Sequence, residues 1–467
     1  MKTEKKYYIP QFHLAPPTGW LNDPNGLCQM NEIHHIFFQY SPDDPTGGTK
    51  YWGHYETKDF IHYDFTGIFL RPDCEEDRDG VYSGSAYVED GEIYLFYTGN
   101  VKKEGNYDYI YSGREGNTLL VVSRDGRTML SKECLLKNKD YPSNMSNHVR
   151  DPKVIFRNGV YYMALGARTK DDEGCVLIYS SQDKKHWKFS HVIQKDNFGY
   201  MWECPDIFEL DGTMYLSLSP QGLKSEEYRF QNIYQSGYFR AENCLTETEN
   251  CLEDFIEWDY GFDFYAPQTY LDEKERRILI GWMGVPDAEY DHDPTIAEGW
   301  QHMLTLPREL HVEKDTKRIL QMPVKELEDL RDTVLFEGNS EEFSASITLS
   351  EQYELFLEKN SNTDAALTFD DGFEIYFDET ENVCTFRFLD PLMGYGRTER
   401  KIKFLPQETL YNMRILMDTS CMEVFMNDGA YVFTTKLFKQ KDKARTLSVQ
   451  GEIGRIKVYS LSGFEIL

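Results

Sequence analysis

Apolar and polar positions repeat along the first 320 residues in a pattern typical of paired β-strands. Each repeat has an apolar strand, a short turn, and a second strand rich in Tyr, Phe and Leu. Three of the turns contain Asp-Gly or Asn-Gly, dipeptides that reach positive φ easily and favour tight hairpins. The five segments with this pattern are Leu27–Tyr40, Ala86–Tyr97, Val154–Leu165, Ile207–Leu218 and Thr269–Gly281.

The second strands of these repeats end about 60 residues apart, which suits one four-stranded blade of a β-propeller. We therefore predict an all-β chain whose residues 1–320 form a five-bladed β-propeller; an ordinary meander of hairpins is the alternative. The pattern Pro323–Asp332 predicts a short helix within a linker at 321–334. Alternating strands resume with a different rhythm, and residues 335–467 are predicted to form a C-terminal β-sandwich that braces the first domain.

Composition and charge narrow the possible partners and the compartment. The 467 residues include 50 Lys+Arg and 79 Asp+Glu, a net charge of −29, which argues against nucleic acid and anionic membranes as partners. No apolar run approaches the roughly 18 residues of a membrane span. Met1–Pro10 lacks the apolar stretch of a signal peptide, and the nine cysteines are scattered without a C-x-x-C pair. We therefore expect a cytoplasmic protein with reduced thiols.

Three carboxylates occupy unusual contexts: Asp23 in a Trp-Leu-Asn-Asp-Pro-Asn-Gly run, Asp151 in Arg-Asp-Pro, and Glu203 in Trp-Glu-Cys-Pro-Asp. Taken singly, such motifs are usually turns. However, they hold near-equivalent places in repeats one, three and four, where an innermost strand begins. Ring closure would bring those places to one axial funnel, so we predict that the three acids share a site.

The same register contains Ser83 in repeat two and Ala266, next to Tyr265, in repeat five. Acid pairs flanked by aromatic rings suit glycoside chemistry, which needs one ionised and one protonated carboxyl group. We expect packing beside Trp202 and Cys204 to favour the neutral form of Glu203, while Asp23, on a polar turn, stays ionised.

We expect neither a metal nor a cofactor. His34 and His35 lie within a predicted strand and have no third ligand at a suitable spacing. They are interpreted as residues on the faces of that strand.

Nine motifs in order along the whole chain resemble glycoside hydrolase family 32, which contains invertases, fructan hydrolases and sucrose-6-phosphate hydrolases. They are Phe12–Gly26, Phe38–Tyr40, Trp52–His54, Tyr82–Ala86, Arg150–Pro152, Trp202–Asp206, Tyr265–Gln268, Gly281–Met283 and Leu306–Leu310. The resemblance implies a five-bladed propeller followed by a β-sandwich, in agreement with the repeat count.

The resemblance also implies roles for individual residues in hydrolysing terminal β-D-fructofuranosyl bonds with retention. Asp23 would be the nucleophile, Glu203 the general acid/base and Asp151 the transition-state stabiliser. Residues expected to contact the sugar are Asn22, Gln39, Trp52, Tyr82, Ser83, Arg150, Tyr265 and Trp282. The stretch Ser41–Tyr51 departs from many relatives because it contains no Trp.

The expected substrate is a small sugar, most naturally sucrose 6-phosphate or sucrose. Lys50, Arg168 and Lys170 could bind a phosphate, although scattered basic residues are more often solvated surface charges. The alternatives are a fructo-oligosaccharide hydrolase, a fructosyltransferase, or a non-catalytic sugar-binding propeller, since fold alone does not decide function. The sequence predicts no oligomeric state.

Overall fold

The structure, a computed structural model, describes residues 6–246, 252–290, 292–343 and 347–467. Its regular elements are almost entirely β-strands, so the predicted all-β class is confirmed. Met1–Lys5, part of the segment used to argue against a signal peptide, and Cys251 lie outside the described residues. None of the helices within those ranges is long and apolar enough to cross a membrane.

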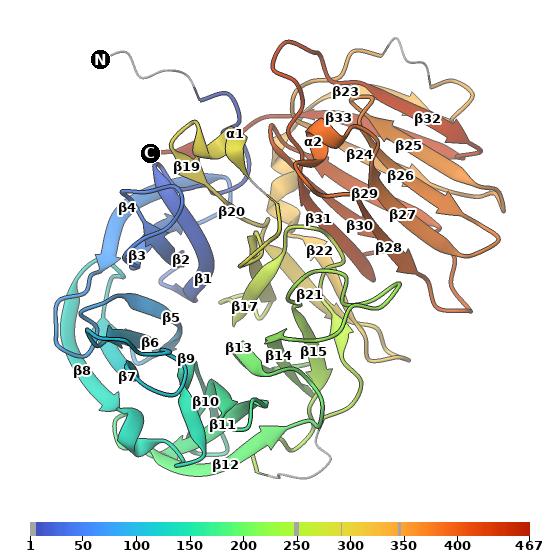
Figure 1. The fold of residues 1–467 in the computed structure, drawn as a ribbon. Helices are drawn as coiled ribbons and strands as arrows, with labels where there is room; N and C mark the ends of the chain where they lie inside the picture. Colours follow the sequence, from blue (N-terminus) through green and yellow to red (C-terminus); the bar gives the residue numbers. More distant parts are fainter. Residues whose placement is uncertain (1–5, 247–251, 291, 344–346) are drawn as a thin grey trace.

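Five consecutive sheets are arranged around a common axis in the first part of the described chain (Figure 1). The first three sheets are β1 (Gly19–Met30), β2 (Ile33–Ser41), β3 (Tyr51–Thr57) and β4 (His62–Leu70); β5 (Val81–Glu89), β6 (Glu92–Lys102), β7 (Arg114–Ser123) and β8 (Met129–Leu136); and β9 (Met145–Arg157), β10 (Val160–Thr169), β11 (Gly174–Ser181) and β12 (Lys188–Gln194). A 3₁₀ turn, Asn138–Asp140, connects β8 to β9.

The fourth and fifth sheets complete this part of the chain. They are β13 (Met201–Leu210), β14 (Thr213–Gln221), β15 (Gly237–Arg240) and β16 (Ile256–Glu257); and β17 (Tyr265–Leu271), β18 (Arg277–Met283), β20 (Met303–Leu304), β21 (Arg308–Val312) and β22 (Ile319–Pro323). The predicted turns form as expected, since Asp90 and Gly91 between β5 and β6 have φ of 51° and 74°.

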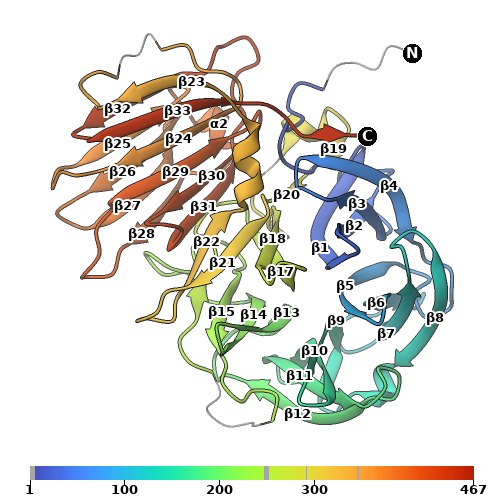
Figure 2. The same ribbon diagram turned by 180° about the vertical axis from the view of Figure 1, so that it is seen from behind.

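The innermost strands of the five sheets contact one another in a closed order: β1 with β5, β5 with β9, β9 with β13, and β13 and β1 with β17. The first sheet also takes strands from later in the chain. After α1 (Asp293–Ile296), β19 (Trp300–Gln301) pairs with β1, and the C-terminal β34 (Glu465–Ile466) pairs with β4. Figure 2 shows the C-terminus beside this sheet. The chain thus returns to the first sheet twice.

Two further sheets lie face to face in the C-terminal part (Figures 1 and 2). One contains β23 (Arg331–Gly338), β24 (Tyr353–Glu358), β29 (Asn412–Met417), β30 (Cys421–Met426), β31 (Tyr431–Lys436) and β33 (Arg455–Leu461); the other contains β25 (Ala365–Phe369), β26 (Phe373–Asp378), β27 (Val383–Phe388), β28 (Glu399–Lys403) and β32 (Leu447–Gly451). Apolar side chains of both, such as Ile415 and Phe386, form one core cluster. α2 (Pro391–Gly394) lies between β27 and β28.

A 3₁₀ helix, Lys325–Leu330, occupies the connection where the sequence predicts a short helix. The connection is shorter than the linker predicted at 321–334. β22 extends to Pro323, and β23 begins at Arg331.

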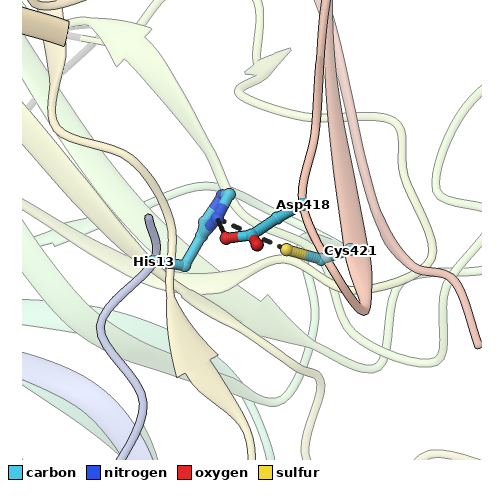
Figure 3. A group of neighbouring side chains, drawn as sticks. All are labelled: His13, Asp418 and Cys421. Atoms are coloured by element: carbon cyan, nitrogen blue, oxygen red, sulfur yellow. Dashed lines mark hydrogen bonds and ion pairs between the residues drawn. The ribbon is translucent and has the colours of Figure 1, made fainter. Parts of the chain in front are cut away.

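A buried polar cluster joins the N-terminal segment to the C-terminal sheets (Figure 3). The His13 ring lies 2.9 Å from Asp418 Oδ2 through Nδ1 and 3.1 Å from Glu423 Oε1 through Nε2. Cys421 Sγ lies 3.4 Å from the same Nδ1. Burial alone would lower the pKa of His13, but the contacts with Cys421, Asp418 and Glu423 outweigh it and hold that pKa well above 6.5. A charged His13 therefore links both parts of the chain.

Candidate active site

A cavity of about 260 Å³ lies where the five innermost strands begin. Each strand contributes at least one side chain, so residues as far apart in sequence as Trp20 and Tyr265, 245 positions, line one cavity. The residues that line it are Trp20, Asn22, Asp23, Gln39, Lys50, Tyr82, Ser83, Arg114, Arg150, Asp151, Glu203, Cys204, Tyr265, Trp282 and Pro286.

All five innermost strands have a pairing irregularity next to a cavity residue. The shifts lie between Leu21 and Pro24, Tyr82 and Gly84, Glu203 and Asp206, and Tyr265 and Gln268, and in the β9–β10 pairing between Arg150 and Lys153. Asp151, Cys204 and Ala266 have positive φ at these points. A bulge re-aims the side chains of its strand, which explains why adjacent residues such as Arg150 and Asp151 both face the cavity.

Asp23 is held by two hydrogen bonds within the cavity wall. Ser83 Oγ donates to Oδ2 at 2.5 Å and Asn22 Nδ2 donates to Oδ1 at 3.0 Å. Trp20 Nε1 in turn donates to Asn22 Oδ1 at 2.8 Å and fixes that amide. Burial raises the pKa of Asp23, while the hydrogen bonds from Ser83 and Asn22 oppose the rise. Asp23 thus lies within strand β1 and not on the predicted polar turn, and its polar contacts come from the Asn22 and Ser83 side chains in a buried setting.

Glu203 is surrounded by donors. Arg150 Nη2 donates to Oε1 at 2.5 Å, and Oε2 accepts from Tyr265 Oη at 2.7 Å and Gln221 Nε2 at 2.8 Å. Trp202 does not pack on this carboxyl group, contrary to the prediction. Its ring is buried against Phe239 in the core between sheets. The physical reason is the alternation of a strand, which sends neighbouring side chains to opposite faces.

Asp151 is the most buried of the three acids. The backbone N–H of Cys204 donates to Oδ2 at 2.9 Å, and Arg150 Nε lies 3.9 Å from the same oxygen. Burial raises the pKa of Asp151 to about 7, although Arg150 and the Cys204 N–H oppose it. The Asp151 carboxyl group therefore faces the cavity while the Cys204 backbone N–H fixes its orientation.

Lys50, Trp20 and Arg114 also line the cavity. From the sequence, Lys50 is named only as a possible phosphate ligand, and Trp20 and Arg114 are not named as site residues. Lys50 Nζ lies 4.9 Å from the centre of the Trp20 ring, and burial lowers its pKa to about 8. Trp20 could have been found from its place in the Asp23 motif. Arg114 begins a strand of the second sheet away from any recognised motif, and nothing in the sequence marks it.

Trp52 is a correction to the predicted sugar contacts. It does not line the cavity; its ring is fully buried between Phe37 and Tyr97, and its Nε1 donates to the Tyr82 carbonyl at 3.1 Å. Of the other two phosphate candidates, Arg168 is paired with Asp172, and Lys170 Nζ donates to a backbone carbonyl. Neither lines the cavity.

Three groups of potential metal ligands lie in the described part of the chain, all outside this cavity. They are His13–Asp418–Cys421, His35–His54–Glu56 and Asp73–Cys74–Asp77. The second group corrects the view that His35 has no neighbouring ligands, since its Nδ1 lies 3.1 Å from His54 Nε2. Cationic side chains already occupy the carboxylates of the last two groups, Arg127 on Glu56 and Lys132 on Asp77.

Comparisons with known proteins agree with this architecture. The models for the glycosyl hydrolases family 32 N-terminal domain and the family 32 C terminal match residues 13–323 and 322–462. Sucrose-6-phosphate hydrolase of Staphylococcus xylosus is 36% identical, covering 93% of this chain and 88% of the relative. Sucrose-6-phosphate hydrolase of Bacillus subtilis is 35% identical, covering 91% of this chain and 88% of the relative.

Solved structures show the same similarity. Sucrose-6-phosphate hydrolase from Lactobacillus gasseri has a TM-score of 0.86 at 27% identity, covering 99% of this chain and 95% of that one. A Bombyx mori beta-fructofuranosidase has a TM-score of 0.84 at 28% identity, covering 99% and 96%. These matches show that the chain is a glycoside hydrolase. It belongs to family 32 of the glycosyl hydrolases.

Proposed function

We propose that this protein is a retaining β-fructofuranosidase that releases fructose from sucrose 6-phosphate or sucrose. The observation that carries the proposal is the meeting of Asp23, Asp151 and Glu203 in one cavity. The relatives named as sucrose-6-phosphate hydrolases support the choice of substrate.

In the first step Asp23 attacks the anomeric carbon of the fructosyl unit. Glu203 gives its proton to the departing oxygen, so the glycosidic bond breaks as the Asp23–carbon bond forms. Asn22 and Ser83 orient the attacking carboxylate. Asp151 binds fructose hydroxyl groups and stabilises the oxocarbenium-like transition state, in which positive charge develops at the ring.

In the second step Glu203 acts as a base. It takes a proton from water, the water oxygen attacks the anomeric carbon, and Asp23 is released as a carboxylate. Two inversions leave the configuration unchanged. Arg150, Gln221 and Tyr265 keep the Glu203 carboxyl group aimed into the cavity through both steps.

For the fold, the five sheets with contacting innermost strands support a five-bladed propeller that carries the site. The two C-terminal sheets support a β-sandwich that braces it, with the boundary near the 3₁₀ helix at Lys325–Leu330. The partner is a small sugar, and a cytoplasmic location fits the dispersed cysteines and a phosphorylated substrate.

The test is the activity of D23A and E203Q on sucrose, sucrose 6-phosphate and a fructan trimer. We expect each variant to lose several orders of magnitude in kcat because each removes a reacting group. Azide should restore turnover of E203Q on a substrate with a good leaving group, since azide needs no base. E209Q, an exposed change on the same strand β13, serves as the folded control. Full activity of D23A or E203Q would refute the assignment.

A further inference from the structure

Arg114 stands out among the charged groups of the cavity. It is half-buried and lines the same wall as Arg150, yet within the described residues its guanidinium forms no ion pair. Its Nε is buried and has no hydrogen-bond partner there. Arg150, in contrast, is paired with Glu203 at 2.5 Å. Leaving a cation desolvated without an acidic partner is costly, so a position like that of Arg114 calls for an explanation.

Among the described residues, the side chain within hydrogen-bond distance of the Arg114 guanidinium is His148, and it does not neutralise the charge. Arg114 Nη1 lies 3.4 Å from His148 Nε2. That nitrogen is also 3.1 Å from the Tyr109 carbonyl, and His148 Nδ1 lies 2.6 Å from Arg150 Nη1. The contacts assign a neutral His148 that accepts from Arg150 and donates to Tyr109, so His148 separates two guanidinium groups without balancing their charge.

The acids of the cavity are already occupied by other groups. Asp23 accepts from Ser83 and Asn22, Asp151 accepts from the backbone of Cys204, and Glu203 accepts from Arg150. Among the described residues, Arg114 thus has no carboxylate in ion-pair contact, and the charge of Glu203 acts on it only at longer range. A phosphate monoester suits it, because a guanidinium binds two phosphate oxygens through parallel N–H groups.

The position of Arg114 relative to the three carboxyl groups indicates which part of the substrate would carry the phosphate. Arg114 is connected through His148 to Arg150, which holds the general acid Glu203. A general acid must lie beside the departing oxygen, so this wall faces the leaving group. Lys50, the other cavity cation outside any ion pair of the described residues, lies over Trp20 and interacts with Asp23 on the nucleophile side.

We propose that Arg114 binds the phosphate of a phosphorylated leaving group and thereby selects a fructosyl sugar phosphate, such as sucrose 6-phosphate, over the unphosphorylated sugar. This proposal rests on the β-fructofuranosidase activity proposed above. It names one residue as the source of discrimination and excludes Arg168 and Lys170, which have other partners.

The experiment compares the ratio of kcat/KM for sucrose 6-phosphate to kcat/KM for sucrose in the wild type, R114M, R114K and K50M. We expect R114M to lower the ratio about 10- to 100-fold, mainly through KM for the phosphorylated substrate, because the charged contact with the phosphate is lost. R114K should restore part of the ratio because the charge remains. K50M, the matched cavity cation on the other side, should leave the ratio within about threefold of the wild type.

A binding measurement separates this proposal from the proposed activity. Calorimetric titration with glucose 6-phosphate and with glucose needs no turnover, and R114M should weaken only the former. An unchanged ratio in R114M, or glucose 6-phosphate binding equal to that of the wild type, would overturn the role of Arg114. A wild type that cleaves neither substrate but binds glucose 6-phosphate through Arg114 would refute the activity alone.

Discussion

At the scale of single residues, the site combines groups that sequence motifs mark and groups that only the fold brings in. Asp23, Asp151 and Glu203 could be predicted as a set because their positions repeat in register. Arg114 could not, because its significance lies in the absence of an ion pair with any described residue, which no linear pattern encodes. The predicted sugar contact of Trp52 is wrong for a related reason. A motif identifies a residue of the site region but does not tell on which face of its strand the side chain lies.

The Ser83–Asp23 hydrogen bond predicts a pH effect. A nucleophilic carboxylate works only when ionised, so activity falls as the pH drops through its pKa. Ser83 Oγ donates to the charged form and lowers the pKa of Asp23; S83A should therefore raise that pKa and move the acid limb of kcat/KM to higher pH. A hydrogen bond to a charged group corresponds to a shift of about one to two pH units.

The control for this profile is S85A, on the same strand β5. Ser85 is buried like Ser83, but its hydroxyl donates to the Pro152 carbonyl and not to a carboxylate. The acid limb of S85A should coincide with that of the wild type. An S83A limb at unchanged or lower pH would contradict the role given to the hydroxyl.

At the scale of elements, the irregular pairing of the innermost strands positions the site. The hairpins were predictable because Asp-Gly and Asn-Gly turns and alternating apolar residues are local signals. The bulges were not, because they depend on how each strand meets its neighbour. Positive φ at Cys204 and Ala266 illustrates this: neither residue type predicts that conformation, and the surrounding sheet imposes it.

Gly84 tests the contribution of one bulge. A Cβ at this position would lie 1.9 Å from the Phe96 carbonyl oxygen, so G84A cannot keep the present β5–β6 pairing. We expect a loss of about 1–3 kcal/mol in unfolding free energy, measured by denaturant titration, and a fall in kcat/KM because Ser83 moves away from Asp23. At Gly91, in the turn of the same hairpin, an added Cβ would meet no atom within 4 Å. Asn suits the positive φ there, so G91N should retain both stability and activity. A fully active G84A would contradict the view that the bulge aims Ser83.

At the scale of the whole molecule, the site depends on later parts of the chain that pair with the first sheet. β19 and β34 attach later parts of the chain to the first sheet, and His13 joins the N-terminal segment to Asp418 and Glu423. The order of repeats could be predicted from the sequence, but these closing contacts could not, because they connect residues 281 to 410 positions apart. They keep five strands at one axis, where two carboxyl groups can act on opposite sides of one bond.

The central claim, retention through an intermediate on Asp23, is tested most directly by letting the wild-type protein cleave sucrose in aqueous methanol. Methanol competes with water for the intermediate, and the methyl fructoside formed cannot mutarotate, so its anomeric configuration records the mechanism and can be determined by NMR. Retention predicts methyl β-D-fructofuranoside. Formation of the α-anomer would contradict retention.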